Sequence, residues 1–443
     1  MNHTMPTPAV IPGPDPTESA VSVSVSVSGP SPAHDPSRTP HRWWRHDWRA
    51  RLRRWAAHYG PVLALYGVLK LIGFSVFMYL LNSSGEYRKR DPRFGGGAHA
   101  WDVLASWDGW WYQQIAAHGY DPALVPVSGA KGLITLEGNS AAFFPLYPAT
   151  MRIVSEATGL GLYGSGMLVS VVASFVAALG VYAVTARFGG RRAGLAAAGL
   201  WAVWPGSGME WAAYSESLYV ALAVWACHAV MSDRWLTAGI LTFAAGLNRP
   251  TSVALIAALT VAGLLALHRR HDDIARPWTA ILIAPLGLAG YLLWVGNEMG
   301  DLSGYFKLQK GAWAHTFDYG EQTVDVFASM AVGRFDYLFA YPLEDTIGAG
   351  VVLLAVLLVP LLIRLRPPAL LLVYTLLTLV LVLGSQQIFG NVSRYLLPVF
   401  PLFIPVAVAL RRLGLPTLFT LLGITAVASG SYAGYVLFEV GVP

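Results

Sequence analysis

The sequence contains little cysteine and little charge. Of its 443 residues only Cys227 is a cysteine, and 12% are Asp, Glu, Lys or Arg. One cysteine excludes an intramolecular disulfide and a zinc site built from cysteine ligands. The charged share is about half of that in a typical soluble domain, which argues against a soluble fold. The net charge of +5 lies in short segments beside apolar runs, so it indicates membrane topology rather than nucleic-acid binding.

Several catalytic signatures are absent as well. The chain has no P-loop, no dinucleotide-binding glycine pattern and no HExxH zinc motif. GSG occurs at 164–166 and 206–208, but without a histidine base placed beside it this pattern does not support a serine protease. These absences argue against an enzyme that binds a soluble nucleotide and against the common metalloproteases.

Apolar runs dominate what is present. Hydrophobic residues make up 55% of the chain, and its mean hydropathy is +0.50. Runs near 20 residues recur, and each is long enough to cross a bilayer as a helix. We therefore expect an all-α polytopic membrane protein with about eleven transmembrane helices. The expected spans are 60–81, 162–185, 193–209, 214–231, 235–248, 251–267, 277–295, 349–365, 368–385, 396–410 and 415–437.

The composition divides the chain into three parts. Residues 1–41 are rich in Pro, Ser and Thr and contain the run VSVSVSVS, which predicts a disordered cytoplasmic tail. Residues 42–59 hold most of the basic, Trp-rich stretch HRWWRHDWRARLRR and are expected to lie at the membrane interface. Residues 60–443 are expected to form the transmembrane domain.

Lys and Arg occur in every second loop. If the basic N-terminus is cytoplasmic, the positive-inside tendency is satisfied along the whole chain. The cytoplasmic basic residues are then Arg187, Arg191, Arg192, Arg234, Arg364, Arg366, Arg411, Arg412 and the cluster at 268–276. This predicts a multi-pass protein of the cell membrane with two large extracytoplasmic loops, 82–161 and 296–348. Most polar residues near helix ends would then share the outer face.

The stretch SWDGWWYQQIAAHGYD, residues 106–121, surrounds one carboxylate with aromatic residues. As a helix over 104–118, it presents a stripe of apolar and aromatic side chains at steps of three or four residues. Such a stripe suits the headgroup layer of a membrane and would hold Asp108 near its surface. Asp108 is then either a helix cap or a general base in a partly dry setting. Its aromatic neighbours are Trp107, Trp110, Trp111 and Tyr112.

Two more outer segments allow both a structural and a functional reading. AAFFPLYPATMR, residues 141–152, has two prolines and is too short to span, so it is either a loop packed on the membrane or a re-entrant turn that shapes a cavity. Glu210 and Glu216 stand where two apolar spans meet. Acids favour a helix N-terminus, yet Glu216 heads a strongly apolar span, where acids are often functional.

Cations gather on the same expected face. They are Arg249 beside Asn248, Lys307 and Lys310 on either side of Gln309, and Arg394. Each cation alone would serve as a headgroup anchor. Together on the face that carries Asp108 they suit an anionic lipid-linked substrate, because arginine and lysine bind phosphate.

Four motifs resemble those of a known family. They are WDGWWYQQIAAHGY at 107–120, FFPLYP at 143–148, AAYSESLYVAL at 212–222 and FAAGLNRPTSVAL at 243–255. In this order and spacing they are similar to the PIG-V-like mannosyltransferases, integral-membrane glycosyltransferases of the GT-C class. The resemblance covers 100–255 well and the C-terminal third loosely. This chain has Trp111 where the family often has His, and Asn-Arg-Pro at 248–250 where the family has Arg-Ser-Asn.

The resemblance implies a GT-C-like fold and transfer of a sugar from a polyprenyl-phosphate donor on the extracytoplasmic side. The family's catalytic acid matches Asp108, and the glutamate of its YSE motif matches Glu216. Asp108 would take the proton of the acceptor hydroxyl as that hydroxyl attacks the anomeric carbon, which inverts the configuration. Trp107, Trp111 and Tyr112 would contact the sugar, and the cations would receive the leaving phosphate.

The expected substrates are a polyprenyl-phosphate hexose, with mannose favoured, and a lipid or glycan acceptor of the cell envelope. The expected substrate-binding residues are Trp107, Trp111, Tyr112, Glu216, Asn248, Arg249, Lys307, Gln309 and Arg394. No cofactor is certain from the sequence, and a divalent cation is a possible one. The alternatives are a transporter or flippase of a lipid-linked sugar and a non-enzymatic assembly protein. Transporters often place polar sites at the midplane of repeated halves, whereas no repeat is visible here.

Overall fold

The computed structural model describes residues 43–128, 134–269, 274–337 and 340–441. The chain divides into two units, 1–54 and 55–443. In the first unit the described residues belong to the start of helix α1, Trp43–Ser84. The expected disordered tail, 1–41, lies outside the described residues. The second unit holds the remaining elements.

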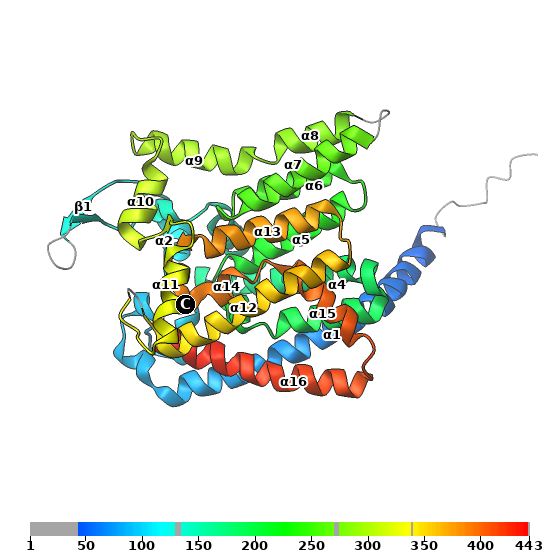
Figure 1. The fold of residues 1–443 in the computed structure, drawn as a ribbon, viewed down its shortest axis with the longest axis horizontal. Helices are drawn as coiled ribbons and strands as arrows, with labels where there is room; N and C mark the ends of the chain where they lie inside the picture. Colours follow the sequence, from blue (N-terminus) through cyan, green and yellow to red (C-terminus); the bar gives the residue numbers. More distant parts are fainter. Residues whose placement is uncertain (1–42, 129–133, 270–273, 338–339, 442–443) are drawn as a thin grey trace, which may run out of the picture. The chain divides into compact units, whose positions relative to one another are not determined.

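The second unit is mostly helical (Figure 1). After α1, the α-helices are α2 (Asp108–His118), α3 (Leu146–Thr158), α4 (Leu162–Ala202), α5 (Glu216–Val230), α6 (Trp235–Gly246), α7 (Ser252–Arg269), α8 (Ala275–Ile283), α9 (Leu286–Glu298), α10 (Gly304–Trp313), α11 (Glu321–Ala331), α12 (Pro342–Arg364), α13 (Ala369–Leu383), α14 (Val392–Tyr395), α15 (Phe403–Leu410) and α16 (Leu415–Ser431). A π-helical segment, Tyr432–Val440, continues α16. Two short antiparallel strand pairs join β1 (Pro126–Ser128) to β2 (Ile134–Leu136) and β3 (Thr316–Phe317) to β4 (Ser385–Gln386).

Within the described residues, six helical stretches are long and apolar enough to cross a membrane. They are Leu52–Ser84, Leu162–Ala202, Ser252–Arg269, Ala275–Glu298, Pro342–Arg364 and Leu415–Glu439. A seventh candidate consists of two pieces, Phe389–Tyr395 and Phe400–Leu410, which are bent by 78° at the break between them. The protein is therefore a mostly helical, multi-pass membrane protein, as the apolar runs predict.

The number of candidate spans is smaller than the eleven predicted from the sequence. One reason is α4, which joins the expected spans 162–185 and 193–209 in one element with a non-helical break at Gly190. A second reason is that α5, α6 and α13 are apolar but have only 15, 12 and 15 residues. An unbroken helix needs about 20 residues to cross the hydrocarbon layer. An apolar run in the sequence also includes turns, such as the 3-10 helix Pro205–Glu210, and these turns do not lengthen the α-helix beside them.

Helix α4 packs closely against its neighbours because small residues line it. A Cβ placed on Gly180 would lie 2.4 Å from Val224 of α5, so the close contact between these helices requires glycine. Large aromatic side chains fill the remaining space. Tyr66 of α1 stacks on Trp201 of α4 with ring centroids 5.7 Å apart, and both side chains are fully buried.

A buried ion pair ties α1 to the 3-10 helix Pro205–Glu210, which follows α4. Lys70 Nζ lies 2.9 Å from Glu210 Oε2 and donates to the Ser207 carbonyl at 2.8 Å. Tyr66 also donates to Glu210. The sequence placed Glu210 among the polar residues of the outer face, but in the structure it is fully buried against α1. Its role is therefore in packing the bundle, because its carboxylate already has two partners.

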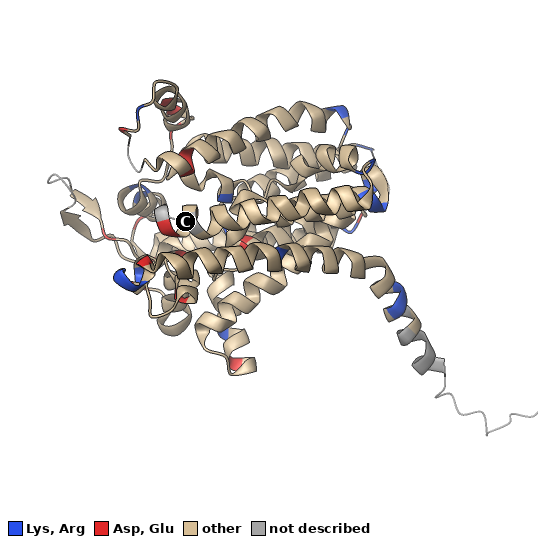
Figure 2. Ribbon diagram, turned by 90° about the horizontal axis from the view of Figure 1, so that it is seen from below, with Lys and Arg blue, Asp and Glu red and all other residues tan. Residues whose placement is uncertain are grey.

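The two long loops cover one end of the helices. The first carries α2, the β1–β2 pair and α3, and the second carries α10 and α11. Figure 1 shows α2, α10 and α11 together at that end. Figure 2 shows Lys and Arg at both ends of the helices, whereas Asp and Glu are concentrated at the end with the loops. The opposite end is therefore predominantly basic, as the alternation of basic loops in the sequence predicts, and which end faces the cytoplasm remains a prediction.

The segment 141–152 contains helical turns that neither reading of its sequence included, and its residues Ala142, Phe143 and Phe144 line a cavity, as the second reading expected. It holds the end of a 3-10 helix, Ser140–Ala142, and most of α3. The two prolines do not prevent a helix, because Pro145 is the N-cap and Pro148 lies in the first turn. Backbone N–H groups in a first turn have no intrahelical acceptor, so proline costs no hydrogen bond there. The backbone N–H of Leu146 donates to the Leu247 carbonyl at 2.9 Å, which ties α3 to the α6–α7 connection.

Candidate functional site

A cavity of about 1050 Å³ opens at the end of the bundle that the two long loops cover. Its wall comes from α2 and the residues before it, from 138–144, from the N-terminus of α5, from the α6–α7 connection, from α10 and β3, and from 381–398. Its lining is mainly apolar and aromatic, with a few charged side chains. A space of this size accommodates a large ligand such as a lipid headgroup with a sugar.

The turn before α2 presents Asp108 to this cavity. Trp107, the N-cap of α2, has φ 55° and ψ −117°, a strained conformation for a large side chain. Its N–H donates to the Arg93 carbonyl at 2.9 Å. Asp108 is the first residue of α2, and its side chain is 26% exposed. Close packing beneath it needs Gly109, because a Cβ there would lie 3.2 Å from the Ala213 carbonyl oxygen.

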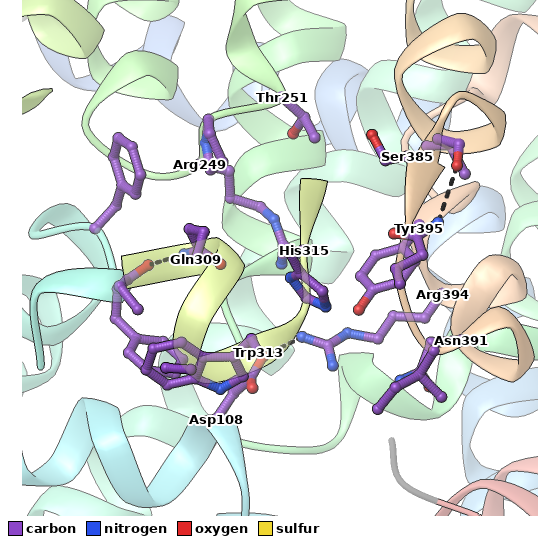
Figure 3. A pocket seen from close by; sticks show the side chains of 18 of the residues that line it. Asp108, Arg249, Thr251, Gln309, Trp313, His315, Ser385, Asn391, Arg394 and Tyr395 are labelled. Carbon is purple, nitrogen blue, oxygen red and sulfur yellow. Dashed lines mark hydrogen bonds and ion pairs between the residues drawn. The ribbon is translucent and has the colours of Figure 1, made fainter. Parts of the chain in front are cut away.

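Four charged side chains form a continuous row at the cavity wall. Arg394 donates through Nη2 to Asp108 Oδ2 and through Nε to Glu216 Oε1. Arg249 Nη1 lies 2.7 Å from the same Glu216 oxygen. Figure 3 shows Asp108 and Arg394 pointing toward one another. Two carboxylates and two guanidinium groups balance, so this row, called here the charged quartet, carries no net charge.

The quartet is removed from water at its centre. The side chains of Arg394 and Glu216 are 3% and 2% exposed. Burying such charges costs free energy that the ion pairs only partly recover, so a buried quartet is weak evidence for stability alone. Buried charges at a cavity wall are more often retained for function.

The break in the α14–α15 pair brings Arg394 into the cavity. Trp204 Nε1 donates to the Ser393 carbonyl at 2.7 Å. Gly206 packs on the same backbone, where a Cβ would lie 2.5 Å from the Ser393 carbonyl oxygen. The guanidinium also lies over the Tyr214 ring, 4.7 Å from its centroid. Irregular backbone at membrane depth needs such protein contacts, and here they fix the position of Arg394.

Ser215 connects Arg249 of the quartet to Tyr112 of α2. Its hydroxyl accepts from Tyr112 at 2.8 Å and from Arg249 Nη1 at 3.2 Å. Its carbonyl accepts from Asn248 Nδ2 at 2.9 Å. Tyr112 and Asn248 therefore hold the site together, and the buried Asn248 Oδ1 has no hydrogen-bond partner among the described residues. That oxygen is free to accept from a ligand.

Aromatic rings from α2, from the segment 138–144 and from α10 form another part of the cavity wall. Trp111 stacks on Phe143 with ring centroids 5.6 Å apart. The centroids of Trp111 and Trp313 are 6.2 Å apart, and the two rings are in an edge-to-face arrangement. The Arg93 guanidinium lies 4.8 Å from the Trp111 centroid. The buried Trp107 Nε1 has no acceptor among the described residues, so it is available to a ligand hydroxyl. Flat aromatic faces beside polar groups are suited to binding a sugar.

His315 is the residue directly before strand β3. β3 pairs with β4 so that Thr316 faces Gln386, and this holds His315 at the cavity wall. Burial lowers the pKa of His315 to about 4, which the Asp108 charge opposes and the Arg394 charge reinforces. The imidazole is therefore neutral at pH 7 and can both donate and accept a hydrogen bond.

The cavity gathers most of the residues singled out in the sequence. Those that line it are Trp107, Asp108, Trp111, Tyr112, Glu216, Asn248, Arg249, Gln309 and Arg394. Lys307 is not brought to the cavity. Its side chain is 58% exposed and pairs with Asp301, whose pKa that hydrogen bond lowers to about 2. The lysine of this helix that lines the cavity is Lys310.

Sequence reasoning missed several lining residues. Arg93 and Tyr395 both border the cavity. Arg93 lies in the 3-10 helix Pro92–Phe94 and belongs to no motif, so its only signal is its place shortly before the aromatic stretch. Tyr395 directly follows Arg394, so a search of the neighbours of each candidate cation would have found it.

The described residues of this site include no ready set of metal ligands. Among the described ranges, no group of three or more His, Cys, Asp or Glu side chains could hold a metal ion. Asp108 and Glu216, the two carboxylates that line the cavity, are already paired with guanidinium groups. The divalent cation considered from the sequence therefore gains no support from the described donors.

No family model and no curated protein matches the chain. Among solved structures, it is similar to the apo oligosaccharyltransferase of Archaeoglobus fulgidus, with 13% identity, a TM-score of 0.48 and coverage of 88% of this chain and 57% of that one. It is also similar to ArnT from Cupriavidus metallidurans bound to undecaprenyl phosphate, with 13% identity, a TM-score of 0.44 and coverage of 80% and 61%.

A further similar structure is the archaeal oligosaccharyltransferase AglB from Archaeoglobus fulgidus in complex with an inhibitory peptide and a dolichol-phosphate. It shows 12% identity, a TM-score of 0.44 and coverage of 88% of this chain and 57% of that one. The chain spans roughly three fifths of the length of the structures it matches. These proteins are GT-C glycosyltransferases. Similarity at this level concerns the course of the helices and assigns no residue a role.

Proposed function

We propose that the protein is a membrane glycosyltransferase that moves a hexose from a polyprenyl-phosphate sugar to a hydroxyl of a lipid or glycan acceptor. The observation that carries the proposal is the position of Asp108. Its carboxylate faces a large cavity that aromatic rings and two arginines also line. A general base, an aromatic surface for the sugar and cations for the phosphate are thus present in one cavity.

Asp108 serves as the general base. Oδ2 is held by Arg394, and Oδ1 has no partner among the described residues, so it can receive a proton. The acceptor hydroxyl loses its proton to this oxygen as its own oxygen attacks the anomeric carbon. Arg394 fixes the carboxylate in position. Because the attack is direct, the configuration at the anomeric carbon inverts.

The leaving group departs toward Arg249. As the bond between the anomeric carbon and the phosphate oxygen breaks, polyprenyl phosphate leaves as an anion. The Arg249 guanidinium sits at the far end of the quartet from Asp108, separated from it by Arg394 and Glu216. A cation in that position stabilises the charge that develops on the phosphate. Base and leaving-group cation therefore stand at opposite ends of the row, as in-line displacement requires.

The finer parts of the proposal come from the sequence. Mannose is the sugar proposed, because the motifs at 107–120 and 212–222 resemble those of PIG-V-like mannosyltransferases. The GT-C-like topology with about eleven spans and an extracytoplasmic site remains part of the same proposal. In this arrangement the short helices α5, α6 and α13 would complete the spans within the bundle.

Transfer from a labelled donor tests the proposal. Purified full-length protein is mixed with polyprenyl-phosphate [³H]mannose and an extract of cell-envelope lipids, and labelled products are separated from the donor. The proposal expects a labelled product that forms only with protein present. If no sugar moves but the protein carries the intact donor across a vesicle membrane, the protein is a flippase instead.

A further inference from the structure

One titratable side chain of the cavity has no place in the proposed mechanism. His315 lines the cavity, and its ring nitrogens make no hydrogen bond among the described residues. Burial lowers its pKa to about 4, so the imidazole is neutral at pH 7. A neutral imidazole has one N–H donor and one acceptor nitrogen, and here both are available to a ligand.

The backbone on both sides of His315 is fixed. Ala314, the C-cap of α10, is left-handed with φ 55° and ψ 25°, which costs free energy in a residue that has a Cβ. The His315 N–H donates to the Gln309 carbonyl at 3.0 Å, and Thr316 pairs with Gln386 of β4. Strained backbone persists only where its surroundings hold it, and such strain is frequent at ligand-binding sites. His315 is therefore held at the cavity wall before a ligand binds.

The imidazole lies toward the end of the quartet that holds the base. The charged groups that act on its protonation are Asp108 and Arg394, and Arg249 is not among them. Figure 3 shows His315 extending toward Arg394. In the proposed mechanism the departing phosphate lies at Arg249. His315 is thus placed to contact the part of the substrate that reacts beside Asp108.

The geometry of the attack limits which substrate atoms are near this imidazole. An acceptor hydroxyl about 2.7 Å from the Asp108 carboxylate and about 3–3.5 Å from the anomeric carbon places that carbon within about 6 Å of Asp108. The oxygens nearest to the anomeric carbon are the one that carries the phosphate, the ring oxygen and the 2-hydroxyl. The first leaves toward Arg249, and the ring oxygen becomes electron-poor in the transition state. The 2-hydroxyl is therefore the group that suits a neutral imidazole.

We propose that the His315 imidazole accepts a hydrogen bond from the 2-hydroxyl of the transferred sugar. The inference rests on the proposed function, because Asp108 defines where the anomeric carbon lies. Positive charge develops beside the 2-hydroxyl as the bond to the phosphate breaks, so a hydrogen bond from this hydroxyl strengthens in the transition state. A contact that strengthens in this way raises the rate of transfer as well as the affinity for the donor. His315 is therefore a residue that selects sugars with a hydroxyl at carbon 2.

Binding of two donors tests the contact without any transfer. Calorimetric titration of the full-length protein in detergent compares citronellyl-phosphate mannose with its 2-deoxy counterpart. We expect the mannose donor to bind about threefold more tightly or better, the effect of one neutral hydrogen bond. His315→Phe should abolish this preference, and His315→Gln should keep part of it, because an amide oxygen also accepts. His315→Ala gives the same readout if the larger ring of phenylalanine does not fit.

A matched control separates this contact from a general effect of losing a histidine. His118 is exposed at the end of α2 and does not line the cavity, so His118→Phe should keep the full preference for the 2-hydroxyl. A 6-deoxymannose donor serves as the control ligand. His315→Phe should leave the preference for mannose over 6-deoxymannose as it is in the unaltered protein, because the 6-position lies away from the anomeric carbon.

Transfer kinetics extend the test to the transition state. The ratio of kcat/KM for the mannose donor to that for the 2-deoxy donor should fall by about tenfold in His315→Phe, which corresponds to about 1.4 kcal/mol of transition-state binding. Most of the change should appear in kcat. The intrinsic effect of the 2-hydroxyl on reactivity cancels, because the same two donors are compared in both proteins.

Two results would overturn the inference. One is a preference for the 2-hydroxyl that is the same in His315→Phe and in the unaltered protein. The other is an equal loss for all three donors in His315→Phe, which would assign the imidazole to the acceptor or to packing. Failure of the proposed function is a separate result, since the unaltered protein would then transfer none of the sugars while the titrations still decide the contact.

Discussion

Asp108 and Arg394 form an ion pair although they lie 286 positions apart in the chain. Asp108 starts a helix of the first long loop, and Arg394 sits at the break of a bent helix pair near the C-terminus. The contact joins the first long loop to the helix bundle at the cavity wall. It also orients the carboxylate that the proposed mechanism uses as a base.

Removing the charge of Glu216 should destabilise the protein strongly. Glu216 is shared by Arg394 and Arg249, so Glu216→Gln leaves one buried guanidinium unpaired. Breaking a buried pair in this way costs roughly 3–5 kcal/mol of unfolding free energy. Thermal unfolding in detergent measures the change. The matched control is Glu156→Gln, which removes an exposed pair with Arg152 and should shift stability by less than about 1 kcal/mol.

An equal shift in the two variants would show that the quartet is not the buried unit described here. A shift in Glu216→Gln that disappears when Arg249→Gln is added would support it. In that double variant only Arg394 and Asp108 remain as a charged pair.

The sequence predicted which residues belong to the site better than it predicted which of them contact each other. The aromatic stripe around Asp108 indicated a helix, and α2 begins at that residue. Glu216 and Arg394 were both candidates, but no local pattern could show that they touch, because 178 positions separate them. Arg93 was missed for a related reason, since its importance comes from the rings that it covers and from no motif of its own.

The described residues hold fewer candidate spans than the sequence predicts, for a different physical reason. Hydropathy measures how apolar a run of residues is, whereas the bounds of a helix also depend on backbone geometry. Gly190 breaks α4 without ending it, and the short α5 starts only at Glu216 although the apolar character begins earlier. The helix in the segment 141–152 was not foreseen, because its prolines fall where a helix tolerates them.

The pair of Lys70 and Glu210 should act in stability rather than in transfer. Lys70→Met leaves the fully buried Glu210 without its cation and should cost about 3–5 kcal/mol. Adding Glu210→Gln should restore much of the loss, because no unpaired charge then remains. Thermal unfolding of both variants measures the coupling. Loss of transfer in the double variant at restored stability would contradict the structural role.

Stability should fall as the pH drops from about 6.5 to about 4. His315 has its pKa lowered from 6.5 to about 4 in the folded protein, chiefly by burial. Between these values the unfolded chain binds a proton that the folded protein does not, so acid favours unfolding by up to about 1.4 kcal/mol per pH unit. His315→Gln should flatten this part of the pH–stability profile. An unchanged slope in His315→Gln would assign the acid sensitivity to another group.

Thiol labelling should place the two ends of the helices on opposite sides of the membrane. Tyr319 is exposed in the second long loop, and Arg412 is exposed at the basic end. The buried Cys227 gives little background, so a single new cysteine can be followed. In intact cells an impermeant reagent should label Tyr319→Cys and leave Arg412→Cys unlabelled. The reverse pattern would invert the proposed topology.

Sugar transfer by Asp108→Asn tests the central claim most directly. Asparagine keeps the shape and can still accept from Arg394, but its amide cannot take a proton. Asp102→Asn is the matched control, because Asp102 accepts from the His99 N–H at 2.8 Å and does not line the cavity. We predict that Asp108→Asn folds and inserts yet transfers at least about a hundredfold more slowly, the low end for loss of a general base, while Asp102→Asn keeps most of its activity. Normal turnover in Asp108→Asn, with or without loss in Asp102→Asn, would contradict the account.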